Sequence, residues 1–141
     1  MYIQKNNTTL VQEVMLSIDS FPILRETVIF KEALEEMGTA RLGIVCIVNE
    51  EKKLIAILTD GDIRRKLLKV QKPFSAFFVD DVLKHSIQSP ITVGPKESLL
   101  DAVMIMEEKK VWDLPVVDNE GVLVGLLHLH PAVKALLGVE K

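Results

Sequence analysis

The sequence predicts an α/β protein built from two copies of one strand-helix-strand-strand-helix unit, packed together with approximate twofold symmetry. The chain matches itself without a gap over a long stretch, beginning where Ser20 aligns with Ser89 and ending where Leu68 aligns with Leu137. Each copy also contains the same order of apolar runs and amphipathic segments. A copy of about 60 residues is too small to bury a core alone. We therefore expect the two copies to pack against each other.

The repeat sets the domain boundaries. We place the first copy at residues 10–69, a connector at 70–78 and the second copy at 79–138. Upstream of the ungapped match, Val11–Met15 resembles Val79–Leu83, in a register one position shorter than that of the repeat itself. The connector contains three of the five phenylalanines. We expect them to fold onto the core, and a contact surface for a partner is the alternative.

The first copy begins with an extended segment around a proline. Its expected elements are that segment, a helix, two strands and a closing helix, at residues 21–24, 30–37, 44–48, 54–58 and from 60 onward. Gly38 is expected to end the first helix, since glycine commonly occupies the position just beyond a helix C-terminus. The closing helix follows a polar corner, Thr59–Asp62, and its apolar residues recur with helical spacing.

The second copy repeats this order. Its extended segment, helix and two strands are expected at residues 90–93, 98–110, 114–117 and 123–127, before a second closing helix. Ser98 is a good N-cap residue, and the lysines at 109 and 110 suit the negative end of the helix dipole. The turn Asp118–Gly121 has the composition of a hairpin turn.

The composition excludes several classes of function. The 141 residues are 48% hydrophobic and 26% charged, as in a soluble globular domain. The net charge of −3 gives no electrostatic reason to expect nucleic acid or a membrane surface as a partner. No apolar run reaches the roughly 20 residues of a membrane-spanning helix, and the first residues lack the apolar core of a signal peptide. We expect a cytoplasmic protein whose one cysteine, Cys46, is a buried thiol.

Three short motifs, together with the internal repeat, carry a resemblance to a known family. They are Thr59–Asp62 (TDGD), Leu114–Asp118 (LPVVD) and Leu123–Leu127 (LVGLL). Over about residues 10 to 138 the chain resembles a tandem pair of cystathionine-β-synthase (CBS) domains, a Bateman module. Residues 59–65 and 123–130 further resemble the regulatory region of bacterial arabinose 5-phosphate isomerases, which serve the synthesis of Kdo for lipopolysaccharide. The TDGD corner also resembles CBS pairs attached to sugar nucleotidyltransferases.

The polar corner at Thr59 is the main candidate site. A strand that leads into a helix through such a corner places backbone N–H groups where an anionic, hydroxyl-bearing ligand can be held. The resemblance implies that Thr59 and Asp62 bind a nucleoside, with the carboxylate accepting hydrogen bonds from the ribose. Arg64 and Arg65 could then reach the phosphates, and strand residues near Ile44 and Val45 would pack on the base. The alternative is local: Thr59 caps the helix and Asp62 favours its N-terminus.

The second copy departs from this pattern. Thr59, Gly61 and Asp62 align with His128, His130 and Pro131, so the matching carboxylate is missing. The resemblance makes Thr92 a further candidate for contact with a ligand, and Trp112 could stack on a base. Two histidines at a spacing of two on a strand, such as His128 and His130, would share a face, but zinc usually requires three or four ligands. We therefore expect no metal site, and a polar strand end at His128 that lines a cleft.

The function expected from the resemblance is that of a non-catalytic regulatory module. The ligand would be an adenine nucleotide or a cytidine nucleotide sugar, and a catalytic sugar-phosphate isomerase domain would be controlled in cis or in trans. An enzyme in its own right is disfavoured, since the sequence offers no nucleophile–base pair and no phosphate-binding loop pattern. A structural dimerisation module without a ligand is the second alternative. A homodimer is expected through helical residues Leu67, Leu68, Leu99, Val103, Met106, Leu136 and Leu137.

Overall fold

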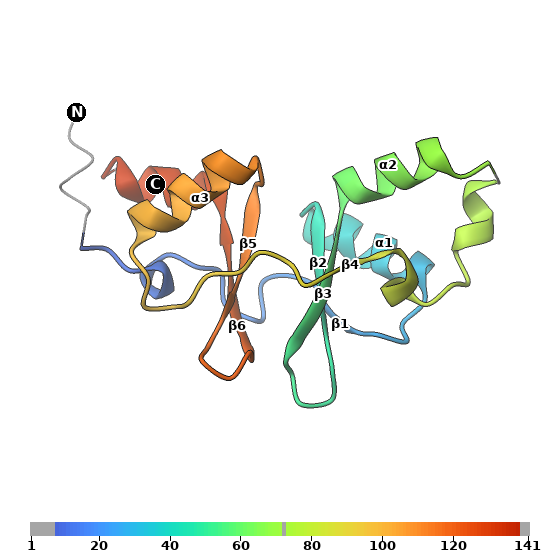
Figure 1. The fold of residues 1–141 in the computed structure, drawn as a ribbon, viewed down its shortest axis with the longest axis horizontal. Coiled ribbons are helices and arrows are strands. Elements are labelled where there is room, and N and C mark those ends of the chain that lie inside the picture. The colour runs from blue at the N-terminus through green and yellow to red at the C-terminus, as the bar shows by residue number, and fades with distance from the viewer. Residues whose placement is uncertain (1–7, 72, 139–141) are drawn as a thin grey trace. The chain divides into compact units, whose positions relative to one another are not determined.

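The computed structural model describes residues 8–71 and 73–138, which form two compact units. The first, the 19–90 unit, is continuous in sequence. The second, the 91–138 unit, also includes residues 8–18. Each unit combines strands with two α-helices (Figure 1). The α/β fold class predicted from the repeat is therefore confirmed.

A four-stranded sheet forms the centre of the 19–90 unit. Its strands, in spatial order, are β1 (Ile23–Arg25), β2 (Ile44–Val48), β3 (Leu54–Thr59) and β4 (Ile87–Gln88). β1 is parallel to β2, and the other pairs are antiparallel. Helices α1 (Phe30–Ala40) and α2 (Asp60–Lys69) complete the unit. All of β2 is buried, as its continuous apolar sequence predicts.

The core of this unit lies between the sheet and its helices. Alternate residues of β2, Val45 and Ile47, point to the same side because side chains alternate along a strand. They meet Phe30, Ala33 and Met37 of α1 in one buried cluster. Residues of α1 three or four positions apart share a helix face, so the helical spacing in the sequence is what brings these three side chains onto the sheet.

The 91–138 unit has the same plan with shorter edges. Strands β5 (Asp113–Val117) and β6 (Leu123–His128) form an antiparallel hairpin, accompanied by α3 (Leu99–Lys109) and α4 (Leu129–Leu136). Single bridges stand where the other sheet has its edge strands. Val93 pairs in parallel with Val116 of β5, and Leu16 pairs antiparallel with Leu126 of β6. The repeat aligns Val116 and Leu126 with Ile47 and Ile57, which pair with β1 and β4 in the first copy.

The leading segments of the two copies are exchanged between the units. Residues 10–18 begin the first predicted copy but belong to the 91–138 unit, and residues 79–90 begin the second predicted copy but belong to the 19–90 unit. The 3-10 helices η2 (Val11–Glu13) and η4 (Val82–His85) lie in these segments. The predicted boundaries at 69/70 and 78/79 stay a prediction, since the compact units divide the chain differently.

The sequence match of these leading segments was in the wrong register. Val11 N donates to Glu97 O in one unit, and Val82 N donates to Val28 O in the other. The structural partner of Val11 is therefore Val82 rather than Val79. Val11 and Val82 are both fully buried, whereas Val79 is 76% exposed. The register that pairs Val11 with Val82 places a buried valine at the same position of both units, and a short sequence match carries no information on burial.

Helix α1 continues past the glycine that was expected to end it. It runs through Gly38 to Ala40, and Arg41 takes the left-handed conformation with φ 58°. Lys110, which the repeat aligns with Arg41, does the same beyond α3, with φ 57°. Ser98 caps α3 as predicted, its Oγ accepting from Asp101 N at 3.1 Å. The left-handed turn is thus a property of the repeat and does not require glycine here.

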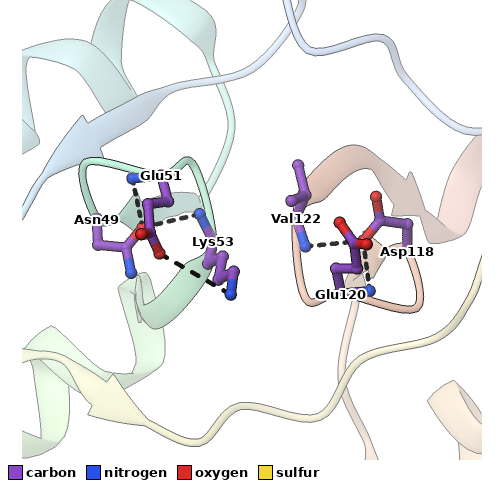
Figure 2. A network of polar contacts seen from close by, with 6 residues as sticks. All are labelled: Asn49, Glu51, Lys53, Asp118, Glu120 and Val122. Carbon is purple, nitrogen blue, oxygen red and sulfur yellow. Dashed lines mark hydrogen bonds and ion pairs between the residues drawn. The ribbon is translucent and has the colours of Figure 1, made fainter.

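The hairpin turns show the repeat at the level of single hydrogen bonds. Asn49 Oδ1 accepts from the backbone N–H groups of Glu51 and Lys53, at 2.9 and 3.0 Å. Asp118 Oδ1 accepts from those of Glu120 and Val122, at 2.8 and 3.0 Å (Figure 2). An amide in one turn and a carboxylate in the other therefore perform the same role, as expected for residues that hydrogen-bond their own backbone.

The helical residues chosen for self-association divide into two groups. Some are buried in the core of their own unit or pack against it, and are not available for a partner: Leu99, Val103, Met106 and Leu136. Leu68 is 82% exposed, and Leu67 and Leu137 are partly exposed. The homodimer itself stays a prediction. In the part of the chain that the structure describes, none of the helices could span a lipid bilayer.

Candidate functional site

The corner at the start of α2 is a closed ring of hydrogen bonds. Thr59 is the last residue of β3 and the N-cap of α2. Its Oγ1 accepts from Asp62 N at 3.2 Å and donates to Asp62 Oδ2 at 2.8 Å, while Thr59 N donates to the same carboxylate oxygen at 3.2 Å. Thr59 and Asp62 therefore form a capping box, which confirms the local role predicted for them.

Arg65 occupies the other carboxylate oxygen. Its guanidinium lies 2.8 Å from Asp62 Oδ1, one turn along the helix. The Asp62 side chain is 13% exposed and that of Arg65 is 60% exposed. A Cβ on Gly61 would lie 3.2 Å from the guanidinium nitrogens, so the missing side chain of Gly61 gives Arg65 its path. Both oxygens of Asp62 have protein partners, and the arginine is exposed enough to exchange its contact for solvent or a ligand.

The remaining predicted residues of this corner differ in their access to solvent. Arg64 is exposed, and within the described part of the chain it forms no ion pair. Ile44 and Val45 are 1% and 0% exposed, and Val45 belongs to the core beneath the helices. These two side chains present no surface on which a base could pack in the described conformation. Their role, like that of Arg64, stays a prediction.

The equivalent corner before α4 uses different chemistry. His128 is the last residue of β6 and the N-cap of α4, but its side chain makes no cap hydrogen bond. Instead, His128 Nδ1 lies 2.7 Å from Oδ1 of Asp113, its partner across the β5–β6 ladder. Burial raises the pKa of the Asp113 carboxyl, and the hydrogen bond and charge of His128 oppose that rise.

Sequence reasoning did not single out Asp113. The signal was present, because the repeat aligns Asp113 with Ile44, an aspartate where the first copy has a buried isoleucine. A carboxylate at the buried start of a strand requires a partner, and His128 supplies it. The second corner thus lacks a carboxylate on its helix, as Pro131 predicts, but has one on its strand.

The other candidates of the second copy are spread around this corner. Trp112 precedes β5 and is 70% exposed, so it is not a core residue. Thr92 is half-buried beside the Val93 bridge to β5. His130 lies in the first turn of α4 and is exposed. The assumption that His128 and His130 share a strand face was wrong, since the strand ends at His128. In the described ranges no three metal-binding side chains come together.

A second polar pair lies in an aromatic cluster of the 19–90 unit. His85 is buried and its Nε2 lies 2.8 Å from Asp80 Oδ2. Its ring packs edge-on against Phe30 and Phe77, at 5.1 and 5.0 Å between ring centroids. Phe77 is buried and contacts Phe74, which confirms that connector aromatics fold onto the core. Sequence spacing does not predict these contacts, because His85 is far from Phe30 along the chain.

Comparison with known proteins now places the fold in a family. The CBS domain model matches residues 11–69 and 79–137. The crystal structure of CBSX2 from Arabidopsis thaliana in complex with AMP is similar with a TM-score of 0.78 at 24% identity, covering 94% of this chain and 98% of that one. Since the identity is low, this likeness shows the fold.

Two curated relatives are enzymes that are longer than this chain. Inosine-5'-monophosphate dehydrogenase of Aquifex aeolicus is 37% identical over 105 residues, or 74% of this chain and 20% of the enzyme. Arabinose 5-phosphate isomerase KdsD of Francisella tularensis is 27% identical over 124 residues, or 88% of this chain and 36% of the enzyme. The chain spans about a third of the length of the first curated relatives it matches. On the match of the family model to both repeats, this chain belongs to the CBS domain family and is a tandem CBS pair.

Proposed function

We propose that this CBS pair is a regulatory module that binds an adenine nucleotide, or a cytidine nucleotide sugar, at the Thr59–Asp62 corner and controls a sugar-phosphate isomerase. The observation that carries the proposal is the state of the Asp62 carboxylate. One oxygen is fixed by the helix cap, and the other is held by a solvent-exposed arginine. A carboxylate held on one side and exchangeable on the other is suited to accept hydrogen bonds from a diol.

Ligand binding would proceed by exchange of partners. Ribose hydroxyls would replace the Arg65 guanidinium at Asp62 Oδ1. The released arginine lies one helical turn from Asp62, and its positive charge would then be free to bind the phosphates. The exposed ion pair of Arg65 with Asp62 is worth little in itself, on the order of 0–1 kcal/mol. Its loss would therefore be a small penalty against several new charge-assisted hydrogen bonds.

Two matches to known enzymes bear on the identity of the catalytic partner. The KdsD relative of Francisella tularensis is an arabinose 5-phosphate isomerase, and the match covers 36% of that enzyme, so that most of it lies outside the aligned region. The isomerase partner is favoured by the two segments that resemble the regulatory region of such enzymes, residues 59–65 and 123–130. The higher identity to an inosine-5'-monophosphate dehydrogenase favours a second candidate, in which a dehydrogenase is the controlled enzyme.

The test is calorimetric titration of the chain with AMP and, separately, with a cytidine nucleotide sugar. Asp62→Ala should weaken binding of the nucleotide that binds by about tenfold to a hundredfold, or about 1.5–3 kcal/mol, since it removes an acceptor shared by two hydroxyls. The matched control is Asp101→Ala, which removes the aspartate at the same position of α3 relative to its cap, Ser98. It should bind as wild type does.

Two results would contradict the proposal. Wild-type affinity in a folded Asp62→Ala protein would reduce the corner to a helix cap. Absence of binding and of thermal stabilisation with every nucleotide would favour a structural module instead, since a ligand that binds only the native state must stabilise it. One observation already favours that alternative: both oxygens of Asp62 are satisfied by protein groups alone.

A further inference from the structure

A small hollow lies between helix α2 and the core of the 19–90 unit. Its lining combines residues of α2 with buried or aromatic side chains of the core, among them Ile63, Lys66, Leu67, Leu58, Phe77 and His85. Its volume is about 10 Å³, close to the roughly 10–15 Å³ that one water molecule requires. The hollow is therefore far too small for a nucleotide, and neither Thr59 nor Asp62 lines it.

The buried imidazole of His85 brings an unpaired polar atom to this lining. Its side chain is 5% exposed, and its Nε2 lies 2.8 Å from Asp80 Oδ2. Because a carboxylate accepts hydrogen bonds, Nε2 carries the proton, and Nδ1 of the neutral ring is an acceptor. Nδ1 is buried and has no hydrogen-bond partner among the described residues. A buried acceptor without a donor costs free energy, so the site calls for a donor small enough to fit the hollow.

Lys66 is the other polar residue of the lining. It is half-buried, and its side chain forms no ion pair or hydrogen bond with another residue of the described ranges. Lysine covers apolar surface with its stem and keeps its ammonium hydrated. The ammonium donates hydrogen bonds and accepts none, so it complements the acceptor of His85. A single water molecule can serve both groups, because it donates to one and accepts from the other.

The second copy shows that the fold itself does not require these two polar groups. The register set by the buried valines of η2 and η4 places Val14 at the position of His85, and the repeat aligns Ala135 with Lys66. Both Val14 and Ala135 pack against the apolar core of the 91–138 unit. Apolar side chains therefore perform in one unit what a histidine and a lysine must perform in the other.

The two closing helices also differ in how much of their surface is buried. Helix α4 buries Ala132 and Leu136, whereas none of the ten residues of α2 is buried. Burial of apolar side chains is the main favourable term that holds a helix to its core. Apolar packing therefore contributes less to the docking of α2 than to that of α4, and a polar link has more to contribute there.

We propose that one water molecule is bound in the hollow and bridges Nδ1 of His85 to Nζ of Lys66. The result is a polar relay, Asp80–His85–water–Lys66, with a carboxylate at one end and an ammonium at the other. A buried water of this kind, with at least two polar partners, is part of the structure. The relay holds α2 to its unit, and it does so independently of the proposed function, which concerns the N-terminus of the same helix.

Hydrogen exchange of the α2 amides in the full chain tests the relay. Lys66→Met keeps the stem and removes the ammonium, and should lower the protection of these amides by about two- to tenfold, as expected for one lost hydrogen bond. His85→Leu removes Nδ1, and Asp80 keeps its ion pair with Lys84 at 3.8 Å. In the His85→Leu background, Lys66→Met should have no effect, because residues of one network are not additive.

A matched control lies on the same helix. Lys69 is exposed and does not line the hollow, so Lys69→Met should change the protection of α2 by the same factor with and without His85→Leu. The water itself is measured by nuclear magnetic resonance. Wild type should show cross-relaxation between a bound water and the ring protons of His85, and Lys66→Met should weaken that signal.

Two results would overturn the inference. One is an equal effect of Lys66→Met on α2 exchange in the wild-type and His85→Leu proteins. The other is the absence of a bound-water signal at the His85 ring in wild type, which decides the matter even if His85→Leu does not fold. Neither measurement contains a nucleotide, so failure of the relay would leave the proposed function intact, and absence of nucleotide binding would leave the relay.

Discussion

The two strand-to-helix corners of this CBS pair have equivalent backbone hydrogen bonds, but most of their aligned side chains differ. At the first, Gly43 and Gly61 leave space that the side chains of Asp60 and Arg65 fill. At the second, the aligned residues are Trp112 and His130, two large rings. The backbone bonds are nevertheless the same: Asp60 N donates to Gly43 O at 3.0 Å, and Leu129 N to Trp112 O at 2.9 Å.

The two copies share their backbone features but not the side chains of their corners. The strands, the left-handed residues after α1 and α3 and the turn hydrogen bonds are kept because each buries or satisfies backbone groups that have no other partner. The corner side chains differ because their hydrogen bonds close within each corner: Asp62 is held by Thr59 and Arg65 in the first, and Asp113 by His128 in the second. Two copies of one fold can therefore hold their charges in opposite ways, on the helix in the first and on the strand in the second.

The largest effect should come from the cores and should be equal in the two copies. Leu58 and Leu127 are aligned by the repeat and are both 0% exposed. Leu58→Ala and Leu127→Ala should each lower the free energy of unfolding by about 2–5 kcal/mol, through lost burial and the cavity left behind. Urea denaturation measures both. A difference of more than about twofold between them, beyond the usual spread of such mutations, would mean that the copies are not energetically equivalent.

Removing the cap should distinguish the corners. Thr59→Ala deletes the hydroxyl that accepts from Asp62 N and donates to its carboxylate, and should cost about 1 kcal/mol in the free energy of unfolding. Ser98→Ala, which deletes the cap of α3, is the matched control and should cost a similar amount. At α4, where no side chain caps the helix, there is no equivalent loss to measure. If Thr59→Ala proved neutral while Ser98→Ala did not, the ring of hydrogen bonds at the first corner would be dispensable.

The ion pair of the second corner predicts a pH dependence of definite sign. The pKa of Asp113 is raised by burial in the folded chain. The protonated carboxyl is therefore favoured by folding, and its contribution is present at low pH and lost as pH rises through the raised pKa. Relative to Asp113→Asn, wild type should lose stability as pH rises above about 4, the ordinary pKa of aspartate. Denaturation curves at several pH values give the slope, and a rise in relative stability with pH would contradict this assignment.

The smallest effect on stability should come from Arg65. Arg65→Ala removes an exposed ion pair and should change the free energy of unfolding by less than about 1 kcal/mol. It should nonetheless affect ligands in opposite directions. Adenosine should bind a few-fold tighter because Asp62 Oδ1 is released, while AMP should lose its advantage over adenosine. That advantage in wild type should fade with added salt.

Arg64→Ala serves as the comparison for Arg65→Ala. Arg64 is exposed and forms no ion pair with Asp62 in the described structure. Its removal should leave adenosine binding unchanged, because the Asp62 carboxylate keeps its partner. Equal effects of the two substitutions on adenosine would show that release of Asp62 Oδ1 does not govern binding at this corner.

The fold class could be predicted from the sequence because the apolar residues of the two copies align with each other. Aligning Ser20 with Ser89 also aligns the buried strands and their helices, and this periodicity reflects packing directly. The cap at Thr59 was also readable, since its partner is three residues away. Interactions of this kind are local and leave a fixed spacing in the chain.

What the sequence did not reveal depends on contacts between distant residues. Asp113 and His128 are 15 positions apart, and their pairing follows from the strand register and not from any spacing rule. His130 was assigned to a strand, but α4 begins at Leu129, two residues before Pro131. Gly38 lies inside α1. The helix ends three residues later, at Arg41, which takes the left-handed conformation and donates its N–H to Met37 O.

The exchange of leading segments has a consequence for the origin of the chain. A single copy of the repeat, such as residues 10–69, would lack the segment 79–90 that completes its sheet with β4. An ancestor with one copy would have had to borrow that segment from a second molecule, as in a domain-swapped dimer. Gene duplication and fusion would then have turned an association that depends on concentration into a covalent one.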